Sequence, residues 1–93
     1  MLYLKVTKDL SMGKKSVPIE LKDGSTFGDL LKGLEQNFGS ELAEEIYDSR
    51  EQSLQVMVWA TINGVLTHNL SDGLDTALHH GDTIIFLPLV MGG

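Results

Sequence analysis

Apolar and polar residues alternate in the first quarter of the chain. In residues 2–6, LYLKV, every second residue is apolar, which is the period of a strand with one buried face. Residues 17–21, VPIEL, alternate in the same way, and Pro18, which has no N–H to donate, indicates an edge strand or the start of a strand. The stretch between them, KDLSMGKKS at 8–16, is polar and contains a glycine, so we expect a loop or turn there.

The period changes to that of a helix after a turn at Asp23-Gly24. Thr26 is predicted to be the N-cap, and Asp29 three residues later gives a weak form of the capping box. Gly39 is the predicted C-terminal stop. Between these signals, apolar residues recur at i, i+3, i+4 and i+7 and then one turn further, which places them on one helix face. They are Phe27, Leu30, Leu31, Leu34 and Phe38.

A small helix and the clearest strand follow. Residues 40–52, SELAEEIYDSREQ, are mostly polar and predict one or two helical turns. In residues 54–62, LQVMVWATI, every second residue from Leu54 is apolar, as in a strand, but Met57 and Trp59 fall on the other face, where polar residues are expected. Asn63-Gly64 is a strong hairpin signal. We expect a short returning strand at 65–68, VLTH, and a last strand, TIIFLPL, after a turn at Gly81-Asp82. This order of elements predicts an α+β fold with a mixed sheet of about five strands packed on one main helix.

The last strand is apolar on both of its faces. A sheet that carries a helix on one side should alternate apolar and polar residues, yet positions 84–87 are all apolar. If the helix covers Ile84 and Phe86, an apolar patch remains uncovered on the opposite face, and such patches mark protein–protein contacts. The predicted patch residues are Met57, Trp59, Ile85 and Leu87. Two alternatives stay open: the segment 42–53 folds over this face, or the assignment of faces is shifted by one residue.

Length and charge narrow the classes of function. A chain of 93 residues builds one domain, because two halves would each be too small to support a core. The net charge of −6, from 13 acidic and 7 basic residues, repels phosphate backbones, so we expect no nucleic-acid binding. The same charge suits a basic partner surface.

Cysteine usage and hydropathy exclude further classes. The chain has no cysteine, which excludes a disulfide framework, a Cys-type zinc site and a cysteine nucleophile. No run reaches 18 apolar residues, so no membrane span is predicted. The first residues, MLYLKVTKDL, lack the features of a signal peptide, and we expect a cytoplasmic protein.

No grouping of side chains predicts catalysis or metal binding. His79 and His80 are adjacent in a turn and point apart, with no cysteine or clustered acids to complete a site. No Ser–His–Asp grouping or phosphate loop has the required spacing. We therefore expect no bound metal or cofactor. Five carboxylates around the small helix are interpreted as a solvated face, with a paired-carboxylate site or an acidic docking surface as alternatives: Glu41, Glu44, Glu45, Asp48 and Glu51.

The sequence closes on Gly92-Gly93. Two such glycines occur by chance roughly once in 200 chains, and a frayed or truncated end is the simplest explanation. Chemistry offers another, because the terminal carboxylate of Gly93 is ionised at neutral pH and is a poor electrophile. ATP-dependent adenylation by a partner converts such a carboxylate into a mixed anhydride, which a sulfur or amine nucleophile can attack.

The residues before the diglycine favour delivery of that carboxylate. Pro88 cannot donate a ladder hydrogen bond, so we expect a domain at 1–88 and a flexible tail at 89–93. Five extended residues span up to about 16–18 Å. Glycine has no Cβ, which allows close approach of backbone in a narrow channel.

The late part of the chain resembles MoaD-type molybdopterin synthase small subunits, which are ubiquitin-like β-grasp sulfur carriers. INGVL followed by HHGDTIIFLPLVMGG is similar to the family's late turn, its GD turn and last strand, its proline and its terminal diglycine. About 35 residues match well, whereas the first half agrees only in the order of its elements. The matching positions are Ile62, Asn63, Gly81, Asp82, Ile84, Phe86, Pro88, Gly92 and Gly93.

The resemblance implies a mechanism and two partners. A ubiquitin-activating-like adenylyltransferase, using ATP, would adenylate Gly93, which is then converted to a thiocarboxylate. The molybdopterin synthase large subunit would bind Leu87 and neighbouring strand residues, while the tail inserts and donates sulfur to the pterin precursor. The tail residues that would thread the channel are Leu89, Val90, Met91 and Gly92.

Departures from the family pattern leave alternatives open. Leu89 stands where a second proline is usual, and Met91 where a small residue is usual. Related carriers serve thiamine synthesis, tRNA thiolation or protein conjugation, so the sulfur acceptor is not fixed. A ubiquitin-like modifier joined through Gly93 to lysines, and a β-grasp interaction module with an incidental diglycine, are the other two classes of function.

Overall fold

The structure, a computed structural model, describes residues 1–10, 13–48, 50–51, 53–54, 58–67 and 70–88. The strands are β1 (Leu2–Leu10), β2 (Gly13–Leu21), β3 (Tyr47–Asp48), β4 (Ser53–Leu54), β5 (Val58–Ile62), β6 (Val65–Leu66) and β7 (Thr83–Pro88). The helices are α1 (Phe27–Lys32), α2 (Leu34–Phe38), α3 (Ser40–Ile46) and the 3-10 turn η2 (Gly73–Asp75).

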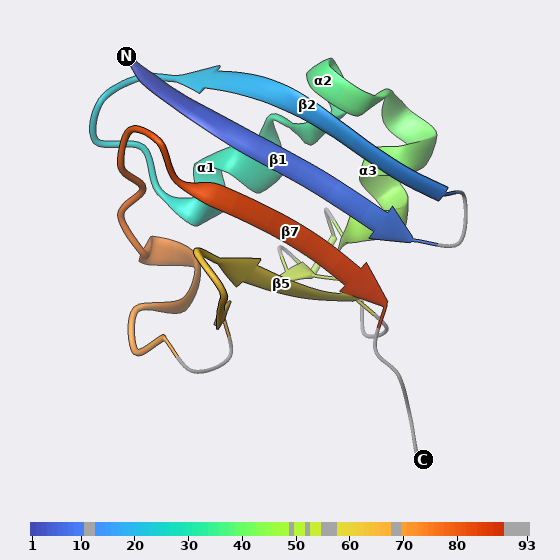
Figure 1. Ribbon diagram of the computed structural model, residues 1–93. Coiled ribbons are helices and arrows are strands. Elements are labelled where there is room, and N and C mark those ends of the chain that lie inside the picture. Colours follow the sequence, from blue (N-terminus) through green and yellow to red (C-terminus); the bar gives the residue numbers. More distant parts are fainter. Residues whose placement is uncertain (11–12, 49, 52, 55–57, 68–69, 89–93) are drawn as a thin grey trace.

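Five strands form the main sheet in the order β2-β1-β7-β5-β6. β1 and β7 are parallel and lie side by side in its centre, whereas β1–β2, β5–β7 and β5–β6 are antiparallel. The helices pack behind one face of this sheet in Figure 1. The predicted α+β fold with a mixed sheet is therefore confirmed.

The core lies between the sheet and the helices, where the alternating strand residues meet the helical stripe. Val6, Ile84 and Phe86 are fully buried on the sheet side. The rings of Phe27 and Phe86 stack with centroids 6.3 Å apart, joining the first helical residue to the middle of β7. The predicted stripe supplies the other layer, with Phe27, Leu30, Leu31 and Leu34 buried and Phe38 partly buried.

The predicted single helix over 27–38 is interrupted at Gly33. The Gly33 N–H donates to the carbonyls of both Asp29 and Leu30, at 3.2 and 3.1 Å, and ψ at Gly33 is 0°. Glycine stabilises a helix less than any residue except proline, so a break here costs little. The capping box is confirmed, because Thr26 Oγ1 accepts from the Asp29 N–H and Asp29 Oδ2 accepts from the Thr26 N–H.

The predicted loop at 8–16 is wrong for most of its length. β1 continues to Leu10 and β2 begins at Gly13, with Lys8 opposite Lys15. The polar composition misled the prediction because strand residues facing solvent need not be apolar. Lys8 faces the core side and is 4% exposed, which shows that a long aliphatic stem can occupy a position suited to an apolar residue.

The predicted long strand at 54–62 is divided in the structure. Val58–Ile62 form β5 with the expected alternation of burial, whereas Ser53–Leu54 pair with Tyr47–Asp48 in a separate two-stranded sheet. Met57 lies outside the described residues.

The segment after Gly39 packs on the helix side of the sheet. Ile46 of α3 is fully buried within the main core, and Ala43 and Tyr47 pack against that core. The described part of 42–53 therefore does not cover the opposite sheet face, which removes one of the two alternatives raised by the sequence. The face assignment is confirmed too, because Ile84 and Phe86 are buried while Ile85 and Leu87 are half-buried.

Candidate functional site

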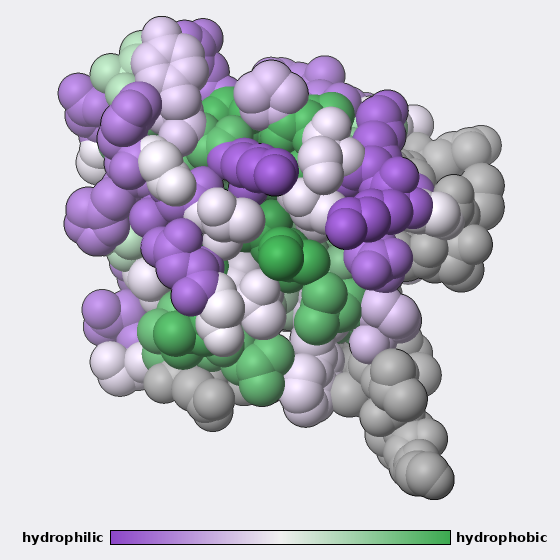
Figure 2. Space-filling model, viewed as in Figure 1, coloured by the Kyte–Doolittle hydropathy of each residue, from purple (hydrophilic) through white to green (hydrophobic). Residues whose placement is uncertain are grey.

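The outer sheet face, opposite the helices, carries an apolar patch on β5 and β7. Leu87 lies directly opposite Trp59, and both are half-buried, as is Ile85 one position along the same face. We call Trp59, Ile85 and Leu87 the outer patch. Figure 2 views this face and shows apolar residues at its centre, over β7, with strongly polar residues around them. Three of the four predicted patch residues thus lie together.

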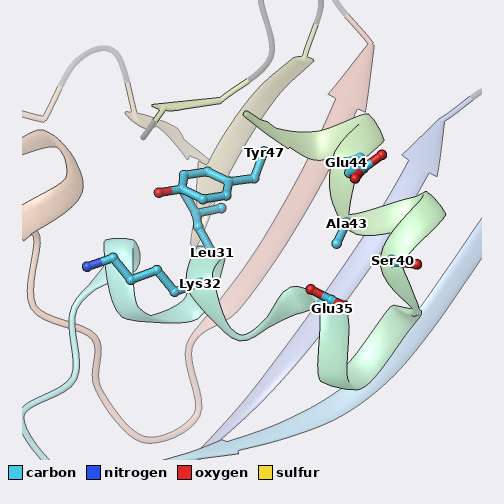
Figure 3. Close-up of a pocket in the computed structure, with 7 residues that line it drawn as sticks. All are labelled: Leu31, Lys32, Glu35, Ser40, Ala43, Glu44 and Tyr47. Carbon is cyan, nitrogen blue, oxygen red and sulfur yellow. The ribbon is translucent and has the colours of Figure 1, made fainter. Parts of the chain in front are cut away.

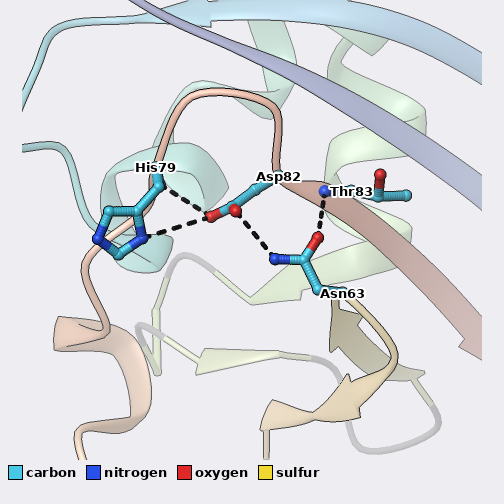
Figure 4. Close-up of polar contacts among 4 residues, drawn as sticks. All are labelled: Asn63, His79, Asp82 and Thr83. Carbon is cyan, nitrogen blue, oxygen red and sulfur yellow. Dashed lines mark hydrogen bonds and ion pairs between the residues drawn. The ribbon is translucent and has the colours of Figure 1, made fainter.

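A polar network fixes the strand that carries this patch. Asn63 Nδ2 donates to Asp82 Oδ1 at 2.9 Å, and the Thr83 N–H donates to Asn63 Oδ1 at 2.9 Å (Figure 4). The Asn63 N–H also donates to the Thr83 carbonyl at 2.8 Å. Asp82 is 8% exposed, so its carboxylate is held almost entirely by these donors and by the His79 N–H. The network ties the end of β5 to the start of β7.

The turn at Asn63-Gly64 explains why this asparagine stands where it does. Both residues have positive φ, at 52° and 86°, as a type I′ hairpin turn requires. Asparagine tolerates that conformation better than most residues and supplies an amide that bonds across to β7. The sequence predicted the turn but not the cross-strand network.

β7 ends at Pro88, which lies opposite Val58 at the end of the β5–β7 pairing. Leu87 therefore lies on the outer face, one residue before the last residue of β7. The predicted tail, Leu89, Val90, Met91, Gly92 and Gly93, lies outside the described residues.

A depression on the outer face adjoins the patch. It has a volume of about 310 Å³, and its lining includes Thr7, Ser16, Ile85 and Leu87. The hydroxyls of Thr7 and Ser16 lie 2.8 Å apart across β1 and β2. Sequence reasoning missed this feature because it assigned 8–16 to a loop, which hid the pairing of the two strands. Residues 7–9, TKD, are all polar, so no alternation continued the strand past Val6 in the sequence.

The adjacent histidines serve the fold. The His80 Nδ1 atom accepts from the Tyr3 N–H at 3.2 Å, and the two rings meet edge to face. The Glu20 carboxylate hydrogen-bonds the Tyr3 hydroxyl and raises the pKa of Tyr3 by that bond and by its charge. His79 Nδ1 lies 3.9 Å from Asp82 Oδ2. Within the described ranges, no three His, Asp or Glu side chains are arranged to hold a metal ion.

A second hollow lies on the helix side, away from the outer patch. It also has a volume of about 310 Å³ and is drawn in Figure 3. Its lining residues are Leu31, Lys32, Glu35, Ser40, Ala43, Glu44 and Tyr47. Of the five carboxylates singled out in the sequence, Asp48 instead accepts the N–H groups of Arg50 and Glu51 in a turn. The paired-carboxylate alternative gains no support from this arrangement.

None of the described helices is long and apolar enough to cross a membrane.

Comparisons with known proteins agree with this geometry. The sequence model of the ThiS family matches residues 2–93. The Haloferax volcanii HVO 2177 protein is 29% identical, with a TM-score of 0.75 over 99% of this chain and 87% of that one. Mycobacterium tuberculosis CysO, described as an antigen, is 31% identical, with a TM-score of 0.65 over 91% of this chain and 99% of that one.

A candidate molybdopterin converting factor, subunit 1, from Pyrococcus furiosus has a TM-score of 0.71 at 22% identity, covering 97% of this chain and 100% of that one. These likenesses confirm the ubiquitin-like β-grasp fold. No curated protein sequence matches the chain.

Proposed function

Because the chain belongs to the ThiS family of ubiquitin-like sulfur carriers, we propose that it carries sulfur as a thiocarboxylate on its C-terminal residue, Gly93. In this role the folded domain is bound by partner proteins, and the tail carries the group that reacts. The absence of cysteine in the chain fits this division, since the transferred sulfur cannot then be held on a side-chain thiol.

The observation that carries the proposal is the relation between the outer patch and the end of β7. Leu87 belongs to the patch and Pro88 ends the strand, so the tail starts at the edge of the docking surface. Residues 89–93 reach up to about 16–18 Å when extended. A protein that binds the outer patch can therefore receive the tail in an active site at that distance.

The chemistry requires a partner that supplies ATP and an active site. A carboxylate oxygen of Gly93 attacks the α-phosphate of ATP, which forms an acyl adenylate and releases pyrophosphate. Sulfide, as HS⁻, then attacks the acyl carbon, AMP leaves and the S–H proton is lost, so the product is the thiocarboxylate. We propose a ubiquitin-activating-like adenylyltransferase as this partner, in keeping with the absence of an evident catalytic grouping in the sequence.

For the sulfur acceptor we propose the pterin precursor of the molybdenum cofactor, within a molybdopterin synthase. The support is the resemblance of residues 62–93 to MoaD-type small subunits, together with the fold shared with the Pyrococcus furiosus protein. On this proposal the large subunit of the synthase binds Trp59, Ile85 and Leu87. Thiamine synthesis and tRNA thiolation remain the alternative destinations of the sulfur.

Mass spectrometry of the chain produced together with an adenylating enzyme and a sulfur donor tests the carrier function. A thiocarboxylate makes the chain heavier by the mass difference between sulfur and oxygen. An unmodified carboxylate with every adenylating enzyme tried overturns the proposal. Isopeptide adducts to lysines, with no thiocarboxylate, assign the chain to the modifiers instead, because an amine can attack the same acyl adenylate.

A further inference from the structure

The outer sheet face is apolar on β7 and becomes polar on β1 and β2. One row of residues, opposite each other in register, crosses all the strands of the main sheet. Its members are Leu66, Thr61, Ile85, Thr7 and Ser16. The row includes the outer patch at Ile85, whereas on β1 and β2 it ends in two hydroxyl groups. These hydroxyls lie in the depression beside the patch.

The hydroxyl pair keeps unused hydrogen-bonding capacity. Thr7 Oγ1 and Ser16 Oγ share one hydrogen bond of 2.8 Å, in which either atom can be the donor. Each hydroxyl has one proton, so this bond uses one of the two and leaves the other to point elsewhere. Thr7 is 5% exposed and Ser16 is exposed, which puts the pair within reach of a group that enters from the surface.

Two lysines flank the hydroxyl pair on the same face. Lys5 and Lys14 both line the depression, and both are exposed. Lys14 lies opposite Asp9, whose charge opposes its own. Lys5 lies between Pro18 and Thr83, neither of which carries a charge. Of the two lysines, Lys5 is therefore the one whose directly opposite neighbours carry no charge. Glu20 lies diagonally opposite Lys5 on β2, and its carboxylate hydrogen-bonds the Tyr3 hydroxyl.

The charges of the chain are distributed unevenly between its parts. Residues 22–51, which include the helices, hold eight acidic and three basic side chains, whereas residues 1–21 hold two acidic and four basic ones. The net charge of −6 thus comes mainly from the helical segment. Of the basic residues in 1–21, Lys8 and Lys15 lie opposite each other on the helix side of the sheet. The outer face of β1 and β2 keeps Lys5 and Lys14, together with Asp9 and Glu20. The charged residues that line the depression are Lys5, Lys14 and Asp9, two positive charges against one negative, and this balance favours an anionic group from a partner.

We propose that this depression accepts an aspartate or glutamate side chain of the adenylating enzyme that docks on the outer patch. The carboxylate lies against the Lys5 ammonium and accepts the free proton of the Thr7–Ser16 hydroxyl pair, while apolar groups of the enzyme cover Ile85 and Leu87. This inference rests on the proposed function, since it takes the docking partner to be an adenylating enzyme. It adds the kind of side chain that the enzyme must present beside its apolar contact.

Zero-length cross-linking tests the contact directly. A carbodiimide joins an amine to a carboxylate only when the two groups touch, with loss of one water. The chain is mixed without ATP with each adenylating enzyme of the thiocarboxylate assay, cross-linked and digested, and the joined peptides are read by mass spectrometry. We expect Lys5 joined to an aspartate or glutamate of the enzyme. Lys15 and Lys22, which are exposed but do not line the depression, are the internal controls.

Binding measurements on charge variants give a second, independent readout. We expect Lys5→Glu to weaken binding at least about tenfold, because like charges facing each other across an interface are strongly unfavourable. Lys5→Arg should keep the affinity, and Lys15→Glu on the neighbouring strand should change it less than about threefold. Changing the cross-linked enzyme residue to lysine should restore binding of the Lys5→Glu chain.

The outcomes separate this inference from the proposed function. Thiocarboxylate formation that is unaffected by Lys5→Glu, with no cross-link at Lys5, overturns the inference and leaves the carrier function standing. A Lys5 cross-link without any thiocarboxylate supports the docking contact and contradicts the carrier function. Absence of binding by the unmodified chain overturns the inference. So does concentration-dependent self-association in sedimentation that Lys5→Glu abolishes, because a second copy then occupies the depression.

Discussion

Trp59 and Leu87 lie directly opposite each other on β5 and β7, on the face of the sheet that the described helices leave open. Their neighbours Ala60 and Phe86 form the next pair and point into the core, where both are fully buried. Phe86 and Leu87, two successive residues of β7, therefore have different roles. Phe86 holds the domain together, and Leu87 is available to a partner.

Substitutions at Phe86 and Leu87 should have different effects on the stability of the domain. Phe86→Ala should lower the free energy of unfolding by about 3–5 kcal/mol, because it removes a fully buried ring that stacks on Phe27. Leu87→Ala should lower it by about 1 kcal/mol or less, as is usual for partly exposed positions. Urea unfolding followed by circular dichroism measures both. Equal losses for the two variants would contradict the division of roles.

Leu87→Asp should abolish thiocarboxylate formation by an adenylating enzyme while leaving the domain folded. A charge in the centre of an apolar contact is desolvated without compensation when the partner binds. Thr61→Asp is the matched control, since Thr61 lies on the same strand face as Trp59 but opposite Ile85 rather than Leu87. We expect a smaller loss there. Normal activation of Leu87→Asp would mean that the enzyme binds elsewhere.

The network between Asn63 and Asp82 can be tested without disturbing the turn. Asn63→Gly suits the positive φ of this position but removes the amide that bonds Asp82 and Thr83. We expect a loss of about 1–3 kcal/mol in unfolding free energy, because a nearly buried carboxylate loses a donor. If Asn63→Gly is as stable as the unmodified chain, backbone conformation alone explains this asparagine. Gly64→Ala, which strains the same turn at φ 86°, is the reference for that effect.

Acid should weaken the start of the first helix through Asp29. The backbone N–H of Thr26, together with its side chain, hydrogen-bonds the Asp29 carboxylate and lowers the pKa of Asp29 below its ordinary value of 3.8. A lowered folded pKa means that the contribution is present above the unfolded pKa and is lost as pH falls through the folded one. NMR titration of the Asp29 carboxyl should show a midpoint below 3.8. A midpoint at or above that value would exclude the capping box in solution.

Loss of Gly93 should stop sulfur transfer and leave the fold unchanged. The reacting carboxylate would then sit on Gly92, one residue and about 3.3–3.6 Å short of its position in the partner. Thiocarboxylate analysis and circular dichroism measure the two effects. A chain lengthened by a few residues after Gly93 is the companion variant, and an interaction module would tolerate both changes.

Periodic patterns predicted the elements whose apolar residues are buried, and failed where polar residues build regular structure. Thr7, Lys8 and Ser16 lie in paired strands although their segment is polar, because backbone hydrogen bonding does not require apolar side chains. The division of the helix at Gly33 and the pairing of Ser53–Leu54 in a separate two-stranded sheet were missed as well. The spacing of apolar residues indicates which face of an element is buried. It does not indicate where a helix is interrupted, as at Gly33, when the apolar residues on both sides stay in the core.

The sequence likewise predicted one part of the candidate site, the outer patch, and missed the other, the depression beside it. The outer patch followed from Ile85 and Leu87 because an apolar residue at a solvent-facing strand position violates the expected alternation. The depression beside it depends on the register of β1 against β2, which brings Thr7 to Ser16 across nine residues of sequence. No local pattern carries that register, so the structure was needed to find it.

The strand that leads to the tail is also the middle strand of the sheet, flanked by β1 and β5. Trp59 and Leu87 come together only when β7 has paired with β5, between β1 and β5 in the sheet. During synthesis this pairing is one of the last to form, because β7 lies near the end of the chain. An enzyme that has to bind both residues therefore recognises the folded domain before it acts on the tail. Unfolded or misassembled chains carry the same tail but lack the paired Trp59 and Leu87. On the proposed function, such an enzyme would therefore activate folded chains in preference to unfolded ones.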